Sequence, residues 1–83
     1  MGTRVELYSR RDCHLCDEAL VVVAQVCEDA GENFEVVDID EVPELRERYT
    51  DEVPVVLVDG AVVGFWRIRP EILSLALAEG AAS

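Results

Sequence analysis

Basic residues are scarce in this chain. Seven lysine and arginine residues stand against 18 aspartate and glutamate residues, which gives a formal net charge of −11 at pH 7. A surface of this sign repels the phosphate backbone of nucleic acids and the anionic surface of membranes. We therefore expect no nucleic-acid partner, and we interpret the excess of negative charge mainly as a contribution to solubility.

Long apolar runs and targeting signals are also missing. The apolar residues fall in short blocks, and none approaches the ~20 consecutive residues needed to cross a bilayer. Residues 1–6 contain neither a basic region followed by an apolar stretch nor the serine or threonine of a myristoylation signal. We predict no membrane partner and a cytoplasmic location. With 83 residues and no linker, residues 1–83 are expected to form one domain and a monomer.

Cysteine is present in an odd number, as Cys13, Cys16 and Cys27. An odd count without a secretory signal argues against a framework of structural disulfides and favours reactive or buried thiols. Cys27 follows Cys16 by eleven residues, which is about 16 Å along a helix. Cα atoms more than about 7 Å apart cannot be joined by a disulfide. Cys27 is therefore predicted to be a core residue.

Short β-branched runs alternate with helical patterns, which predicts an α/β fold. The predicted strands are residues 3–9, 34–39, 53–58 and 61–66, and the predicted helices are residues 13–30, 43–49 and 70–79. Gly31 is suited to end the first helix, and Asp59-Gly60 is a preferred two-residue hairpin turn. The order β-α-β-α-β-β-α predicts a four-stranded mixed sheet with helices on both faces, which resembles the thioredoxin-like, glutaredoxin-type arrangement.

Cys13 and Cys16 stand where the first predicted strand gives way to the first predicted helix. Unpaired N–H groups and the positive end of the helix dipole favour an anion there, so we expect the Cys13 thiolate to be stabilised. Cys16 falls on the apolar face one turn further on, where a buried thiol is suited to resolve a mixed disulfide. His14, as an imidazolium, and Arg10 are further candidates for stabilising the thiolate, and the charge of Arg11 acts in the same direction.

Two segments of the chain resemble the glutaredoxin family. Residues 8–16, YSRRDCHLC, resemble its active-site segment, and residues 53–60, VPVVLVDG, resemble its second characteristic segment. The resemblance covers nearly the whole chain and implies a small thiol–disulfide oxidoreductase in which Cys13 is the nucleophile and Cys16 resolves.

The resemblance also implies where a substrate binds. In that family the proline corresponding to Pro54 has a cis peptide bond and lies against the active-site cysteines. The preceding residue, here Val53, offers backbone groups to an extended thiol substrate. The physical chemistry agrees, because cis bonds are nearly confined to proline and Pro54 opens a strand, where a missing N–H costs least. With Arg11 and Gly64, these residues form our set of substrate-binding candidates.

The identity of the reductant stays open in this resemblance. Glutaredoxins that use glutathione are similar to one another in a Gly-Gly pair and an aspartate after the fourth strand, whereas here Gly64 is followed by Phe65, Trp66 and Arg67. Arg10 matches the basic residue that the family uses near the glycine carboxylate of glutathione. Residues 66–72 instead resemble the end of glutaredoxin-like hydrogen donors of ribonucleotide reductase, which are recharged by thioredoxin reductase. We expect no tightly bound cofactor, a disulfide-containing protein or small thiol as substrate, and either glutathione as co-substrate or a thioredoxin-reductase-type donor.

Two other functions are compatible with the sequence. Cys13, Cys16 and His14 could supply ligands to a metal ion or an iron–sulfur cluster, although a closed site would need a second copy of the chain. The chain could also be a non-catalytic thioredoxin-fold binding module, with Phe65 or Trp66 as the contact. A Cys13 thiol with ordinary reactivity would favour the binding module.

Overall fold

The structure is a computed structural model that describes residues 3–79. In chain order its elements are β1 (Val5–Ser9), α1 (His14–Ala30), β2 (Phe34–Asp38), the 3-10 helix η1 (Ile39–Glu41), α2 (Pro43–Tyr49), β3 (Val55–Val58), β4 (Ala61–Phe65) and α3 (Pro70–Glu79). The strands form one sheet in the order β2-β1-β3-β4. β1 is parallel to β2 and antiparallel to β3, and β3 is antiparallel to β4. The predicted mixed sheet of four strands is confirmed.

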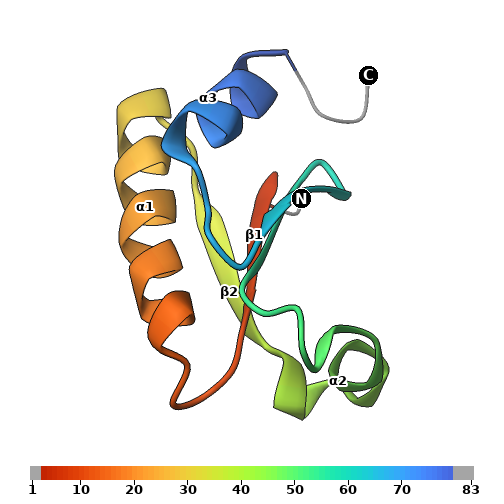
Figure 1. The fold of residues 1–83 in the computed structure, drawn as a ribbon. Helices are drawn as coiled ribbons and strands as arrows, with labels where there is room; N and C mark the ends of the chain where they lie inside the picture. Colours follow the sequence, from red (N-terminus) through yellow and green to blue (C-terminus); the bar gives the residue numbers. More distant parts are fainter. Residues whose placement is uncertain (1–2, 80–83) are drawn as a thin grey trace.

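Helices cover both faces of the sheet, as predicted. Because side chains alternate along a strand, β1 and β3 each supply residues to two separate clusters. The larger cluster lies under α1 and α3 and contains Val5, Leu7, Ala19, Val23, Val26, Cys27, Val56, Val58, Leu73 and Leu77. The smaller cluster lies on the α2 side and contains Ile39, Tyr49, Val55 and Leu57, with Tyr8 of β1 packed against it. Figure 1 shows α1 and α3 together on one side of the sheet and α2 on the other. Every residue of β3 is therefore buried.

Helix α1 begins at His14, one residue later than predicted, and ends before Gly31 as predicted. Cys13 is its N-cap residue, with an extended backbone. Gly31 is its C-cap residue, has a φ of 70°, and donates its N–H to the carbonyl oxygens of Cys27 and Glu28. Glycine adopts this left-handed conformation without the steric cost of a Cβ atom. Within residues 3–79, no helix is both long and apolar enough to span a membrane.

The predicted hairpin turn between β3 and β4 is present. Asp59 and Gly60 have φ values of 52° and 85°, as a two-residue turn with the right twist requires. The Arg4 guanidinium bonds the Asp59 carboxylate through two contacts of 3.0 Å and the Glu32 carboxylate at 2.8 Å. This arginine lowers the pKa of the Asp59 carboxyl below its usual range. The ion pairs fasten the turn to the start of β1.

Several element boundaries differ from the sequence predictions. β2 ends one residue earlier, because the Asp38 carboxylate accepts the N–H of Asp40 at 2.9 Å and caps η1, which the sequence did not predict. β3 begins at Val55 rather than two residues before it. β4 ends at Phe65, because Trp66 has a φ of 64° and leaves the extended conformation.

Candidate active site

Cys13 and Cys16 are joined by a disulfide across the first turn of α1. Their Cα atoms are 5.1 Å apart, within the range for a disulfide. The Cys13 sulfur accepts the backbone N–H of Cys16 at 3.1 Å, and the Cys13 carbonyl accepts the N–H of Asp17 at 3.2 Å. A helix N-terminus that directs an N–H at a sulfur atom stabilises negative charge on that sulfur. The pair therefore lies at the strand–helix junction that the sequence predicts.

The two cysteines of the pair differ in exposure. Cys13 is partly exposed, whereas Cys16 is only 2% exposed. The neighbouring Asp12 is exposed and has a φ of 57°, so the loop turns sharply before it enters the helix. An incoming substrate can therefore reach Cys13 more easily than Cys16.

His14 is the first residue of α1 and is exposed. In the part of the chain that the structure describes, the Cys13 sulfur accepts a hydrogen bond from the backbone of Cys16 and receives none from the imidazole. A role for His14 in stabilising the thiolate stays a prediction.

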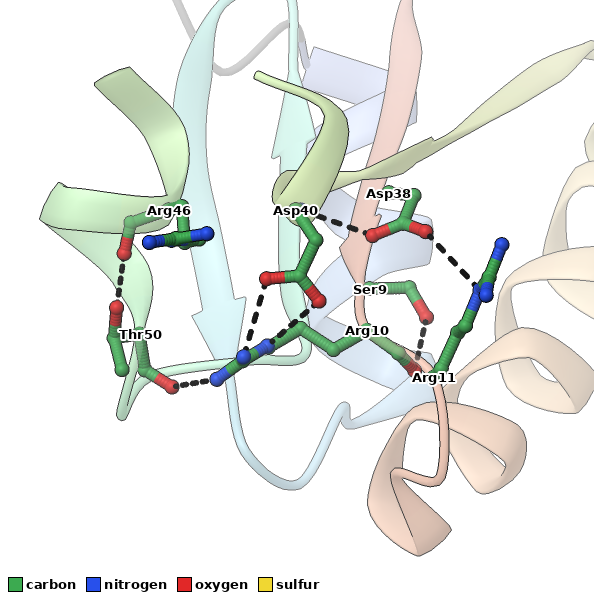
Figure 2. A network of polar contacts seen from close by, with 7 residues as sticks. All are labelled: Ser9, Arg10, Arg11, Asp38, Asp40, Arg46 and Thr50. Atoms are coloured by element: carbon green, nitrogen blue, oxygen red, sulfur yellow. Dashed lines mark hydrogen bonds and ion pairs between the residues drawn. The ribbon is translucent and has the colours of Figure 1, made fainter. Parts of the chain in front are cut away.

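The two arginines before the cysteine pair have acidic partners, as Figure 2 shows. Arg10 contacts the two carboxylate oxygens of Asp40 at 3.2 Å and 3.1 Å, and donates to the carbonyl of Thr50 at 3.5 Å. Arg11 lies 4.0 Å from the Asp38 carboxylate, and its side chain is 87% exposed. Their roles toward the thiolate and the substrate stay predictions, because each cation is already directed at a carboxylate.

The sequence analysis missed these ion pairs, although a signal for them exists. β1 and β2 are parallel, and Ser9 is in register with Asp38. Residues that follow two parallel neighbouring strands emerge at the same edge of the sheet, so Arg10 and Asp40 come together. The acidic residues after β2 were the available signal.

Pro54 lies immediately before β3 and is fully buried. The Val53–Pro54 peptide bond is cis, as the family resemblance implies. The Pro54 carbonyl accepts the backbone N–H of Trp66 at 2.8 Å, which joins this segment to the end of β4. Val53 is partly buried, and its contact with a substrate stays a prediction.

Residues 65–68 come directly after Gly64, and we call this segment the β4–α3 corner. Gly64 pairs with Val56, and a Cβ atom built on it would lie 3.5 Å from the Ile68 Cδ1 atom, an ordinary contact. The Trp66 indole N–H donates to the Asp51 carbonyl at 2.9 Å. Its ring meets the Phe65 ring edge-on at a centroid distance of 5.2 Å. These contacts fix the orientation of the indole. The role of Gly64 in substrate binding stays a prediction.

Two cavities connect the β4–α3 corner to the Cys-X-X-Cys segment. Both are lined by Leu15, Trp66 and Arg67. The smaller has a volume of about 120 Å³ and is completed by Glu18, Ala19, Val22 and Ile68. The larger has a volume of about 420 Å³ and is completed by Phe65. The sequence analysis missed Leu15 as a site residue, although its position between the two cysteines was a signal.

The third cysteine lies away from this site. Cys27 is 1% exposed, has a free thiol, and belongs to the core cluster under α1 and α3. Burial raises the pKa of its thiol, which makes it a poor nucleophile. The prediction that Cys27 is a core residue is confirmed. Across residues 3–79, no three His, Cys, Asp or Glu side chains are grouped so that they could hold a metal ion.

Known proteins resemble this chain in sequence and in fold. Two uncharacterized proteins, from Mycobacterium bovis and Mycobacterium tuberculosis, are each 30% identical to this chain, with 78% of this chain and 72% of the relative aligned. The X-ray structure of protein XcR50 from X. campestris has 33% identity and a TM-score of 0.73, and covers 89% of this chain and 95% of its own.

A likeness in fold extends to a named glutaredoxin. The glutaredoxin of Archaeoglobus fulgidus superposes with a TM-score of 0.63 at 24% identity, over 94% of this chain and 88% of its own. The family model of the glutaredoxin-like domain (DUF836) matches residues 4–78. The chain belongs to the family of the glutaredoxin-like domain.

Proposed function

We propose that this protein is a thiol–disulfide oxidoreductase in which Cys13 attacks the substrate and Cys16 resolves the mixed disulfide. The observation that carries the proposal is the pairing of a partly exposed cysteine at the N-terminus of α1 with a cysteine that is 2% exposed. A glutaredoxin-like fold with a Cys-X-X-Cys pair supports a redox function.

The reaction starts from the reduced dithiol. The Cys13 thiolate attacks one sulfur of a substrate disulfide, the substrate S–S bond breaks, and the first substrate thiolate leaves and takes a proton from water. Cys16 then loses its proton to water and attacks the Cys13 sulfur. The second substrate thiolate leaves, and the Cys13–Cys16 disulfide of the structure is formed. Two electrons pass from the protein to the substrate.

The oxidised protein must be reduced before the next cycle. We propose glutathione or a thioredoxin-reductase-type donor as the source of the two electrons, a disulfide-containing protein or small-thiol disulfide as substrate, and no tightly bound cofactor. The proposed setting is the cytoplasm, where disulfides are mostly transient and catalytic.

A single-turnover experiment tests the proposal without knowledge of the reductant. The protein is reduced, freed of reductant, and mixed with an equimolar small disulfide such as hydroxyethyl disulfide. We expect wild type to release two thiols per protein, and Cys16→Ser to release one and keep the other half as a mixed disulfide visible by mass spectrometry. Cys13→Ser is expected to react at least about 100-fold more slowly, because its remaining site thiol is buried.

Cys27→Ser is the matched control, because it removes a thiol outside the site. It is expected to release two thiols at the wild-type rate. A Cys13→Ser variant that reacts as fast as wild type, or a Cys16→Ser variant that accumulates no mixed disulfide, would contradict the proposed roles.

A further inference from the structure

The β4–α3 corner presents an apolar surface beside the cysteine pair. Trp66 is 51% exposed and Phe65 is also exposed, although both are large apolar side chains. The indole N–H of Trp66 is already bonded to the Asp51 carbonyl, so the exposed part of the ring is apolar. Leu15, from inside the Cys-X-X-Cys segment, faces the same two cavities. An apolar side chain that enters between Leu15 and Trp66 would contact the Cys-X-X-Cys segment through Leu15.

Trp66 contributes to this surface from an unfavourable backbone conformation. Its φ of 64° lies in the left-handed region that favours glycine. The conformation is held by the backbone bond to Pro54 and the indole bond to Asp51. An L-residue in a sparsely populated conformation persists where the surroundings fix it, and such positions concentrate at binding sites.

Arg67 supplies a free cation at the edge of the same surface. It lines both cavities and is exposed, and it forms no ion pair with any residue between 3 and 79. An arginine that lacks an ion pair among residues 3–79 and lines cavities with Leu15 is available to a ligand. Glu18 borders the smaller cavity only, so a carboxylate would be bound on the Phe65 side of Arg67.

We propose that the β4–α3 corner binds an extended segment of a disulfide-bearing protein, with an apolar residue next to its cysteine and a carboxylate just beyond. The apolar side chain lies between Leu15 and Trp66, and the carboxylate pairs with Arg67. The inference rests on the proposed function, because it names the substrate class of that same site. It also runs against the overall charge of −11, which by itself would favour a basic substrate.

Peptide disulfides of opposite charge test the assignment of Arg67. The probes are two short peptides, each with leucine beside a cysteine that carries a thionitrobenzoate group, followed by aspartate in one and lysine in the other. Attack of reduced Cys13 on the peptide sulfur releases the coloured thionitrobenzoate anion, the better leaving group. At 0.15 M salt, where surface charges are screened beyond about 8 Å, we expect wild type to react about threefold faster with the aspartate peptide, as a partly exposed ion pair allows.

Charge reversal should invert that preference. Arg67→Glu is expected to react faster with the lysine peptide than with the aspartate peptide. Arg46→Glu should keep the wild-type ratio, because it reverses an exposed arginine on α2 that has no ion pair with any described residue. A wild-type ratio of one or less, or an equal change in both variants, would overturn the inference and show that overall charge decides the preference.

A second variant tests the apolar contact. Replacement of leucine by alanine in the aspartate peptide should slow wild type about fivefold, since part of a leucine side chain is no longer buried. Trp66→Gly removes the indole, yet glycine accepts the positive φ, so the corner can keep its path. Trp66→Gly should react with the leucine peptide and with its alanine version at similar rates. A fivefold difference that persists in this variant would exclude Trp66 as the contact.

Failure of this inference is distinguishable from failure of the proposed function. If the reduced wild-type protein releases no thionitrobenzoate from either peptide, thiol–disulfide exchange itself is absent. If release occurs but the preference for leucine and aspartate does not, exchange stands and the substrate class proposed for the corner is wrong.

Discussion

The two flanks of the cysteine pair use arginine in opposite ways. On the α2 flank, Arg10 is held by Asp40 and by the Thr50 carbonyl, so its charge is compensated within the protein. On the flank of the β4–α3 corner, Arg67 has no ion-pair partner among the described residues and stands beside exposed aromatic rings. The first arginine contributes to structure, and the second is available for recognition.

The difference between the two flanks changes the interpretation of the segment after Gly64, where the chain departs from the glutathione-using glutaredoxins. The sequence analysis treats the segment after Gly64 as a place where a Gly-Gly-Asp pattern is missing. The structure shows Trp66 fixed by two hydrogen bonds in that segment, where it lines two cavities together with Leu15. The segment is therefore an ordered surface with a different chemistry rather than a vacant part of a binding site.

Asp40→Asn should give the largest measurable difference between the two flanks, because it should affect stability and leave the peptide preference unchanged. Neutralising Asp40 breaks a two-point contact between side chains that are 34% and 35% exposed. We expect the free energy of unfolding to fall by up to about 1 kcal/mol, measured by urea denaturation of the oxidised protein at pH 7. The ratio of rates with the aspartate and lysine peptides should stay at the wild-type value.

Arg67→Glu is the matched comparison for Asp40→Asn, because the two substitutions are expected to have opposite consequences. Arg67→Glu should alter the ratio of rates with the aspartate and lysine peptides. It should change the free energy of unfolding by less than about 0.5 kcal/mol, since no ion pair is lost. If Arg67→Glu destabilised the protein as much as Asp40→Asn, Arg67 would have a structural partner, and the contrast between the flanks would fail.

Asp59→Asn should have the smallest effect and no effect on the peptide ratio. Arg4 lowers the pKa of the Asp59 carboxyl, so this ion pair stabilises the protein above the ordinary carboxyl pKa, and the contribution is lost as pH falls through the lowered value. Asparagine tolerates the positive φ of this turn position. Melting curves should show a small deficit in the variant at pH 7 that closes as the pH falls through the lowered pKa of Asp59. A deficit that grows on acidification would contradict the expected loss of this ion pair's contribution to stability at low pH.

Local patterns predicted most of the fold, and tertiary contacts account for what they missed. The start of α1 beside Cys13, its end at Gly31 and the Asp59-Gly60 turn depend on neighbouring residues, so the sequence identifies them to within one residue. The contacts of Arg10 with Asp40 and of Trp66 with Asp51 join residues 30 and 15 positions apart. No local pattern encodes these contacts, and they decide which side chains near the cysteine pair are free.

The resemblance to glutaredoxins predicted a backbone feature that periodicity could not. It implied a cis bond before Pro54, and the structure has one. It could not anticipate the left-handed Trp66, because the chain departs from the family pattern at that segment. Leu15 was overlooked for another reason, since its partners come from the end of β4, which is distant in sequence.

Alkylation of the reduced native protein tests the central claim most directly. The claim is that Cys13 is the accessible, activated thiol, that Cys16 lies behind it, and that Cys27 is inert. Iodoacetamide at pH 7, with site mapping by mass spectrometry, should modify Cys13 at least about tenfold faster than Cys16 or Cys27, and faster than the same cysteine in urea-unfolded protein. Modification of Cys16 first, or equal rates at all three cysteines, would contradict the account.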